Sequence, residues 1–452
     1  MRSALPDSPR NLGTLMRLSS LLRRPARPGA VLATLVILLV PIHRVSGQAS
    51  PPPDALDTLS LVRAQALARE ASAELRAARA SVAVAEARLR QGAAFANPTL
   101  SVRHEQSGAN GLSNSQLIAA IDQPIEIAGT RGARQRVLAL RLGAAEATRA
   151  DAERGLDFEV AEAFAAWVAA ERSLALSQEA AEAFAEAAEA SDARFAAGDI
   201  SGYAHRRLRL ESARYAGFAA ERALAQRSAR RSLARLLGVS DDALPRGAAG
   251  AREAESAETR ASDDSLRRIA TRERPDLRAA RLAADAARAE TVLARRERFP
   301  FVSLSAGVKN EQVGGVGALR GLVAGVALPL PLWDRNSAAI DASLAVTTER
   351  TAEAEALERR IATEVGDAAD AHRTIQVQLD LLRPRLGGES TQALRAARVA
   401  YAEGEITLLE WLDAVRAYHD AELTFASLEA QATIRRAALE RAIGLPITRI
   451  VP

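Results

Sequence analysis

The chain has 452 residues, of which 48% are apolar but only 4% aromatic, and it contains no cysteine. This composition excludes disulfides and thiolate metal sites, and it favours long helices packed over small side chains rather than the bulkier core of a compact enzyme. The formal net charge of +4 depends on residues 1–47, which hold seven arginines and one acid; without them, 53 basic residues face 55 acidic ones, and nucleic-acid binding loses its electrostatic basis.

Residues 1–47 have the three parts of a secretory signal peptide. The apolar part is shorter than the about 20 residues that a membrane-spanning helix needs, which favours a cleaved signal over a retained anchor helix. Met16 is an alternative start to Met1. The three parts are, in order, the arginines Arg23, Arg24 and Arg27, the apolar run Val31–Val40 and the cleavage-site pattern Val45-Ser46-Gly47.

The first half of the remaining chain alternates between two kinds of pattern. A helical stretch rich in Ala, Arg and Glu precedes alternating apolar and polar residues around a Gly/Asn/Ser loop, which predict a β-hairpin. The next helix is far longer than those of globular domains, because one apolar stripe in steps of three and four runs through it. The predicted elements are a helix over 56–91, a hairpin over 99–123 with its loop at 107–115, a long helix over 131–197 and a return helix over 203–237.

The second half repeats this order, so the chain divides into two repeats, 48–238 and 263–445. Residues 239–262 predict a linker between them, and residues 446–452 a C-terminal tail. The predicted elements of the second repeat are a hairpin over 301–330, a long helix over 336–403 that Pro384 and Gly387-Gly388 interrupt, and a return helix over 408–443.

A seven-residue segment is the most specific sign of this duplication. Phe195-Ala196-Ala197-Gly198-Asp199-Ile200-Ser201 returns as Tyr401-Ala402-Glu403-Gly404-Glu405-Ile406-Thr407, an offset of 206 residues that also separates Gly238 from Gly444. Glycine ends a helix by adopting a left-handed conformation at little cost, and a Ser or Thr just beyond it caps the next helix. The sequence therefore predicts a tight tip between two long antiparallel helices at 195–201 and again at 401–407.

The hairpins predict an oligomer. Each predicted strand is about eight to ten residues long, near the length that crosses a bilayer at a tilt. Four strands cannot close a barrel, and open strand edges in hydrocarbon leave backbone groups unpaired at several kcal/mol each. Three chains would supply twelve strands, continued by the long helices. Soluble strands beside an ordinary coiled coil remain the alternative.

The duplicated order of helix, hairpin, long helix, glycine tip and return helix resembles the TolC family of outer-membrane efflux proteins, over about residues 55–445. The run Pro329-Leu330-Pro331-Leu332-Trp333-Asp334-Arg335-Asn336 is most similar to the CzcC-like branch, which serves metal efflux. The resemblance implies a mainly α protein with a small β part: one protomer of a homotrimer whose twelve-stranded β-barrel crosses the bacterial outer membrane and continues as a periplasmic α-helical barrel. It also implies contact with outer-membrane lipid, a periplasmic adaptor protein and an inner-membrane pump of the resistance–nodulation–division type.

The resemblance implies that the helix tips meet the adaptor's helical hairpin. A bare glycine with an exposed β-branched neighbour suits such a contact, although both glycines could serve only to end their helices. The positions that match are Ala197, Gly198, Asp199 and Ile200 in the first repeat, and Glu403, Gly404, Glu405 and Ile406 in the second.

Three further residues match family positions that narrow the periplasmic entrance: Tyr401, Glu410 and Asp413. Glu410 and Asp413 are three residues apart and share one helix face, so three copies around an axis would form acidic rings that attract cations. Solvated carboxylates on an exposed face are the alternative. The first repeat has Ala204 and Arg207 at the equivalent positions and supplies no matching acids.

The chain departs from the best-known family members at the predicted gate. Ile406 stands where those members carry a basic gating residue, and Ala204 where they carry its acidic partner. The sequence therefore predicts a looser or hydrophobic gate.

No catalytic or metal-binding pattern emerges. The histidines His104, His205, His372 and His419 form no i, i+4 pair, and Gly314-Gly315-Val316-Gly317 lacks the lysine and helix of a phosphate loop. The sequence predicts no enzyme, no cofactor and no bound metal. Three functions remain: an exit duct for metal ions or small toxic solutes, a type I secretion duct, or a periplasmic coiled-coil scaffold without a pore. The sequence does not identify the cargo.

Overall fold

A computed structural model describes residues 58–109, 112–245, 261–299, 301–315, 317–386 and 389–450. The chain divides into two units, Met1–Pro53 and Asp54–Pro452, and all described residues belong to the second. The predicted signal peptide and most of the predicted linker, residues 246–260, lie outside the described residues.

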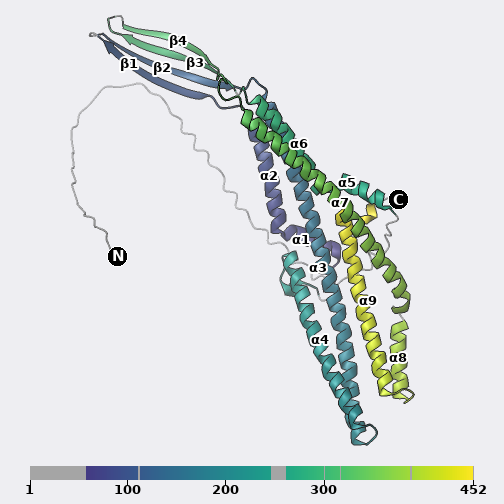
Figure 1. Cartoon of the computed structure of the whole chain (residues 1–452). Helices are drawn as coiled ribbons and strands as arrows, with labels where there is room; N and C mark the ends of the chain where they lie inside the picture. Colours follow the sequence, from purple (N-terminus) through teal and green to yellow (C-terminus); the bar gives the residue numbers. More distant parts are fainter. Residues whose placement is uncertain are drawn as a thin grey trace, which may run out of the picture. The chain divides into compact units, whose positions relative to one another are not determined.

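The described elements follow the same order twice, as the duplication predicted (Figure 1). The first half holds α1 (Leu61–Ala71), α2 (Ala73–Ala93), β1 (Thr99–Ala109), β2 (Leu112–Ile125), α3 (Thr130–Ala196) and α4 (Gly202–Leu237), followed by the 3-10 turn η1 (Asp241–Ala243). The second half holds α5 (Asp263–Glu273), α6 (Pro275–Arg296), β3 (Val302–Val313), β4 (Gly317–Ala327), α7 (Ser337–Leu386), α8 (Glu389–Ala402) and α9 (Leu408–Ile443), followed by the 3-10 turn η3 (Ile447–Arg449).

The helix α3 is the longest element and has 67 residues, as predicted. At about 1.5 Å per residue it is about 100 Å long. Its predicted apolar stripe is buried at Leu156, Val160 and Trp167, and the helix lies against α4, α6 and α9. It therefore connects the two repeats along their length.

The predicted single helix over 56–91 is wrong, because the structure has two helices there. The break falls at Ser72, whose backbone leaves the helical region at φ −59° and ψ 123°. Its hydroxyl accepts a hydrogen bond from the backbone N–H of Leu75 at 3.1 Å and caps α2. A serine that caps a new helix can end the preceding one without glycine or proline.

The two hairpins form one antiparallel sheet in the order β1-β2-β3-β4. The central pairing joins the repeats, with Asn114 opposite Val313 at one end and Ile125 opposite Val302 at the other. The predicted loop at 107–115 was too long, since Ala109 and Leu112 still pair across the first hairpin. The second hairpin was predicted to reach residue 330, but β4 ends at Ala327, just before a segment with prolines at 329 and 331.

The predicted helix over 336–403 is divided into α7 and α8. Pro384 lies in the last turn of α7, where it removes one backbone donor. Gly387 and Gly388 lie outside the described residues.

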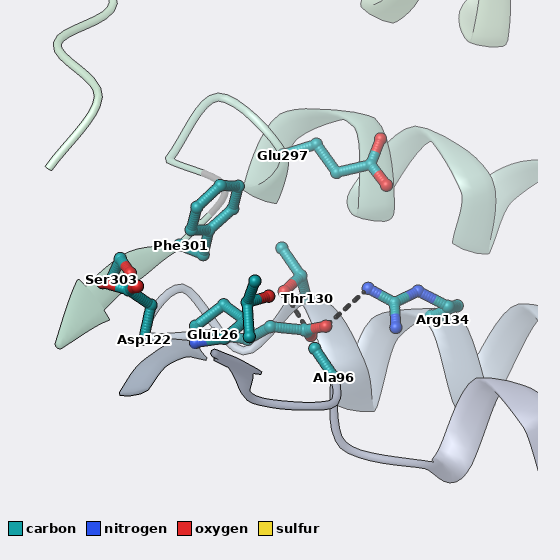
Figure 2. A pocket seen from close by; sticks show the side chains of 10 residues that line it. Ala96, Asp122, Glu126, Thr130, Arg134, Glu297, Phe301 and Ser303 are labelled. Carbon is teal, nitrogen blue, oxygen red and sulfur yellow. Dashed lines mark hydrogen bonds and ion pairs between the residues drawn. The ribbon is translucent and has the colours of Figure 1, made fainter. Parts of the chain in front are cut away.

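The junction between β2 and α3 is fixed by Glu126 (Figure 2). Its carboxylate accepts hydrogen bonds from the Thr130 hydroxyl at 2.7 Å and from Arg134 at 2.9 Å. These groups line a hollow of about 520 Å³ between the base of the sheet and the first turn of α3. Since Thr130 opens α3, Glu126 sets where the long helix begins.

Three apolar clusters hold the helices together. The first joins α1, α2, α3 and α4 around Trp167, and the second joins α5, α6, α7 and α9 around Ile361. Each is confined to one repeat, and Leu233 and Leu237 of the first correspond to Leu439 and Ile443 of the second at the offset of 206. The third cluster combines residues of both repeats close to the helix tips.

Candidate functional site

The first helix tip is a hydrogen-bonded turn around Gly198. The N–H of Gly198 donates to the carbonyl of Phe195 at 3.0 Å, and the N–H of Asp199 donates to the carbonyl of Arg194 at 2.8 Å. This pair of bonds is the Schellman arrangement, and it needs the left-handed conformation that Gly198 adopts at φ +81°. Ser201 then caps α4 by accepting the N–H of Ala204 at 3.2 Å.

The second tip repeats this backbone around Gly404, which has φ +79°. The N–H of Gly404 donates to the carbonyl of Tyr401 at 3.2 Å, and the N–H of Glu405 to that of Ala400 at 2.8 Å. Thr407 caps α9 and forms a capping box with Glu410, whose carboxylate accepts the N–H of Thr407 at 2.7 Å. The hydrogen bond from this N–H, followed by that from the Thr407 hydroxyl, lowers the pKa of Glu410.

Each tip is closed by two stacked rings, which the sequence analysis missed. Phe195 stacks on His205 with centroids 4.9 Å apart, and Tyr401 stacks on Trp411 with centroids 5.4 Å apart. The offset of 206 residues relates Phe195 to Tyr401 and His205 to Trp411. An aromatic ring seven residues after each glycine was therefore a readable signal in the sequence.

The second tip packs against the first repeat. Trp411 contacts Phe184 of α3 edge to face at 5.7 Å, and Phe184 stacks on Tyr215 of α4 at 4.2 Å. All three side chains are buried. Their cluster also includes Ile406, so this residue is half-buried and not the exposed β-branched neighbour that the sequence predicted.

Polar contacts join the repeats beside this cluster. Arg416 of α9 pairs with Glu211 of α4, whose side chain is only 10% exposed. Arg172 of α3 pairs with the buried Glu422 of α9 at 2.9 Å. Both carboxylates are largely buried, so removing either arginine would weaken the compensation of a buried charge, which is costly.

His419 is buried in the same region. Its Nε2 lies 3.3 Å from the Ser177 hydroxyl, and its ring meets Tyr215 edge to face at 5.6 Å. Burial lowers the pKa of His419, while the neighbouring Asp420 opposes that shift. The sequence left packing and a surface position open for this residue, and the structure buries it.

The predicted adaptor-contacting residues surround the two turns. Nothing lies within 4 Å of where a Cβ would stand at Gly198 or Gly404, so both glycine backbones are open to a partner. Ile200 is half-buried, like Ile406. The exposed members of the set are Ala197, Gly198, Asp199, Glu403, Gly404 and Glu405.

The three predicted entrance residues differ in their surroundings. Tyr401 is half-buried in its stack, and its hydroxyl accepts a hydrogen bond from Arg194 at 3.4 Å. Glu410 and Asp413 are exposed on α9, and Asp413 lies 3.7 Å from Arg416. Glu410 thus has a local role in capping α9 in addition to any role at an entrance.

Among the described residues, no group of three His, Cys, Asp or Glu side chains could hold a metal ion. None of the described helices combines the length and the apolar composition that a membrane-crossing helix requires.

Comparisons with known proteins agree with this architecture. The sequence model of the family described as "Outer membrane efflux protein" matches residues 266–445. The nickel and cobalt resistance protein CnrC of Cupriavidus metallidurans is 31% identical over 342 residues, 75% of each chain. The cobalt-zinc-cadmium resistance protein CzcC of the same organism is 26% identical over 397 residues, 87% of this chain and 92% of that protein.

Solved structures share the fold. A structure of CusC, described as undergoing conformational changes on folding and transmembrane channel formation, superposes with a TM-score of 0.70 at 20% identity, over 85% of this chain and 92% of that one. The outer-membrane channel OprN superposes with a TM-score of 0.68 at 20% identity, over 89% and 96% of the two chains.

Proposed function

This chain belongs to the outer membrane efflux protein family, and we propose that it is the exit duct through which divalent metal cations leave the cell envelope. It is a non-enzymatic efflux channel of the outer membrane with a periplasmic helical extension. The metal cargo is proposed from the relatives CnrC and CzcC, whose names assign them to nickel, cobalt, zinc and cadmium resistance.

The observation that carries this proposal is the four-stranded sheet. Its hairpins come from opposite halves of the chain, yet they pair along the whole of β3 and along β2 from Asn114 to Ile125. Within the described residues, β1 and β4 each have one strand neighbour, so each leaves an edge of backbone donors and acceptors unpaired. In a bilayer such edges must be closed by other strands, which supports a homotrimer whose twelve strands form one barrel.

The helix tips fit a contact with a periplasmic adaptor of an inner-membrane pump of the resistance–nodulation–division type. Both tips expose a glycine backbone without side-chain cover, flanked by Asp199 in one and by Glu403 and Glu405 in the other. A helical hairpin could approach these backbones closely. The acids favour basic side chains on the adaptor.

The entrance acids fit a cationic cargo. Asp413 is exposed and lies 3.7 Å from one cation, Arg416, so its charge is only partly balanced. Three copies around the trimer axis would concentrate cations at the entrance. Tyr401 and the half-buried Ile406 would supply an aromatic and aliphatic constriction in place of the basic gating residue and acidic partner that the best-known family members carry.

Conductance and resistance measurements test the proposal together. We expect trimers in the outer-membrane fraction that resist SDS until heated, ion conductance in planar bilayers, and nickel or cobalt sensitivity when the gene is deleted. A soluble periplasmic monomer would instead support the scaffold. Conducting trimers whose loss affects export of a polypeptide, with no change in metal resistance, would support the type I secretion duct.

The site residues have separate tests. Asp413→Asn should lower the cation-over-anion permeability ratio, whereas Asp199→Asn, at the first tip, should leave it unchanged. Because the chain has no cysteine, single cysteines at Asp199 or Glu403 can be cross-linked to the adaptor on a clean background. A cysteine at the exposed Arg227 of α4, well away from both tips in sequence, serves as the matched negative control.

A further inference from the structure

The two faces of the sheet differ sharply in charge. The strand register places alternate residues on a common face, and the face that carries Val102, Ala119, Val308 and Leu322 in one row is here called the outer face. Among its described residues it has no acid, one arginine, Arg320, and one histidine. The opposite face, here called the inner face, carries the remaining charges of the strands: Arg103, Glu105, Asp122, Lys309 and Glu311.

Exposure and pairing identify the outer face as the one that meets lipid. Along β3 from Ser303 to Val313, outer-face residues are exposed and inner-face residues are half-buried, as expected for a sheet that curves around its polar side. On the inner face, Lys309 pairs with Glu311 at 2.7 Å and Arg103 lies 3.9 Å from Glu105. A barrel wall with an apolar outside and a paired, polar inside matches this pattern.

Arg320 lies at one boundary of the apolar band. It shares a row with His104, Leu117 and Asn310, and toward the hairpin ends the next row is again polar, with Gln106, Ser115 and Gln312. In the other direction the outer face of β4 continues as Leu322, Ala324 and Val326.

The strand length places this boundary at a membrane interface. From Arg320 to Leu328 the chain advances eight residues, about 27 Å at 3.4 Å per residue and about 21 Å along the membrane normal at a tilt of about 40°. Beyond Leu328 lies Trp333, which is 93% exposed and suits the interface on the helical side. Arg320 therefore reaches the interface on the side away from the helices, where a lipid-facing arginine costs much less than it does at the bilayer midplane.

The guanidinium of Arg320 has no internal partner among the described residues: it is exposed and makes no hydrogen bond or ion pair with them. The nearby surface between Leu117, Val308 and Leu322 is hollowed, and Arg320 lines the same hollow. An arginine fork matches the geometry of a phosphate, and an apolar hollow beside it suits an acyl chain.

We propose that Arg320, supported by His104 in the same row, binds the phosphate of an anionic lipid in the outer leaflet, with an acyl chain in the hollow beside Leu322. The inference rests on the proposed channel, since it needs the sheet to stand in a membrane. Arg320 lies on β4 and His104 on β1, which are the two edges of the sheet. Closure of the barrel therefore brings the β4 edge of one chain, with Arg320, next to the β1 edge of another chain, with His104. The lipid therefore binds at the seam between subunits.

The test measures lipid retention on the full-length purified trimer. The protein is incubated with mixed vesicles of phosphatidylglycerol and phosphatidylcholine, returned to neutral detergent and analysed by native mass spectrometry. We expect the wild type to retain phosphatidylglycerol over phosphatidylcholine, and Arg320→Gln to lose about fivefold of that preference, as expected for one lost charged contact of about 1 kcal/mol. Arg320→Lys keeps the charge without the fork and should give an intermediate value.

The matched control is Arg103→Gln, which removes an arginine from the inner face one row away. It should leave phosphatidylglycerol retention unchanged. Equal retention by Arg320→Gln and the wild type would overturn the inference, as would displacement of the lipid by millimolar inorganic phosphate, which would point to a free anion as the ligand.

Conductance separates this inference from the channel itself. Conducting trimers without any preference for phosphatidylglycerol would overturn the lipid site alone. If Arg320→Gln fails to form trimers, the comparison of wild type, Arg320→Lys and Arg103→Gln decides the question. A wild type that forms no trimer would contradict the channel and, with it, the seam that binds the lipid.

Discussion

The two helix tips share a backbone but differ in side chains. Gly198 and Gly404 adopt nearly the same left-handed φ, and at both tips the N–H groups of the glycine and of the next residue donate to carbonyls of the preceding helix. Around this common frame, the first tip has a stacked His205, held near Ser191 and Asp192, where the second has Trp411. The duplication therefore preserved the turn and changed what surrounds it.

The difference lies in what each ring contacts beyond its stack. Trp411 is buried against Phe184 of the first repeat and belongs to the cluster shared by both halves. His205 instead stays within its own repeat, in polar contact with α3. The ring after the second glycine thus packs against the neighbouring pair of helices, whereas the ring after the first glycine stays within its own repeat, and a change at Trp411 should reach both repeats.

Removing the two rings should give the largest contrast. Trp411→Ala leaves a cavity beside Phe184 and Tyr401, and we expect it to lower the free energy of unfolding by about 3–5 kcal/mol. His205→Ala removes one stack and one hydrogen bond, for which we expect about 1–2 kcal/mol. Urea denaturation followed by far-UV circular dichroism measures both. Equal losses would contradict the claim that, of these two rings, only Trp411 packs against the other repeat.

Replacing the two glycines should give no contrast at all. Gly198→Ala and Gly404→Ala each place a side chain at positive φ, with no neighbour to clash with, so each should cost about 1–2 kcal/mol. Gly217→Ala, in the interior of α4 with open space around it, is the matched control and should stabilise the protein by about 0.5–1 kcal/mol. A cost at one tip glycine only would show that the turns are not equivalent.

Most of the fold could be predicted from repetition and periodicity. The offset between Gly198 and Gly404 located both tips, the spacing of apolar residues indicated the long helix α3, and Gly238 and Gly444 marked the ends of the return helices. These features depend on residues close together in sequence, where a missing Cβ or a missing N–H has a fixed local consequence. Ser72 was missed because a serine only sometimes ends a helix, depending on whether its hydroxyl finds an N–H to accept.

The contacts between repeats could not be predicted in this way. Glu211 and Arg416 are 205 residues apart, and their pairing depends on how α4 and α9 are rotated about their axes. Helical periodicity gives the stripe of each helix but not its neighbour. The capping box at the second tip could have been found, because Thr407 and Glu410 have the Ser/Thr-x-x-Glu spacing of that motif. Glu410 also fits an entrance ring, and the sequence analysis gave it that role alone.

Acid should weaken the shared cluster through His419. Burial lowers the pKa of His419 in the folded protein below the about 6.5 of an unfolded chain, despite the opposing charge of Asp420. The unfolded state therefore binds the proton more readily, and stability should fall as the pH decreases below about 6.5 toward the folded-state pKa.

The measurement is the urea midpoint between neutral pH and mildly acidic pH. His419→Gln keeps a polar group facing Ser177 but cannot titrate, so its midpoint should fall less on acidification than that of the wild type. His372 is also buried with a lowered pKa, which leaves a residual slope in this variant. An unchanged slope in His419→Gln would show that the shared cluster does not sense pH.

Removing the helix caps should give the smallest difference in stability between the two tips, and adding the missing cap residue tests directly whether the tips are equivalent. Ser201→Ala and Thr407→Ala both remove an N-cap oxygen, for which we expect about 1 kcal/mol each. The loss at Thr407 should be the larger, because Thr407 also takes part in the capping box and Ser201 does not.

The first tip lacks only the glutamate of the box, at the third helical position, since Ala204 stands where the second tip has Glu410. Ala204→Glu should complete the box and raise the free energy of unfolding by a few tenths of a kcal/mol up to about 1 kcal/mol. Ala204→Gln provides a neutral version that can still accept the N–H of Ser201, so a gain with glutamate but none with glutamine would assign the effect to helix-dipole charge. No gain with either would mean that the turn at Gly198 holds Ser201 in a different orientation from Thr407. The two tips would then be equivalent up to the glycine but would differ at the N-cap that follows it.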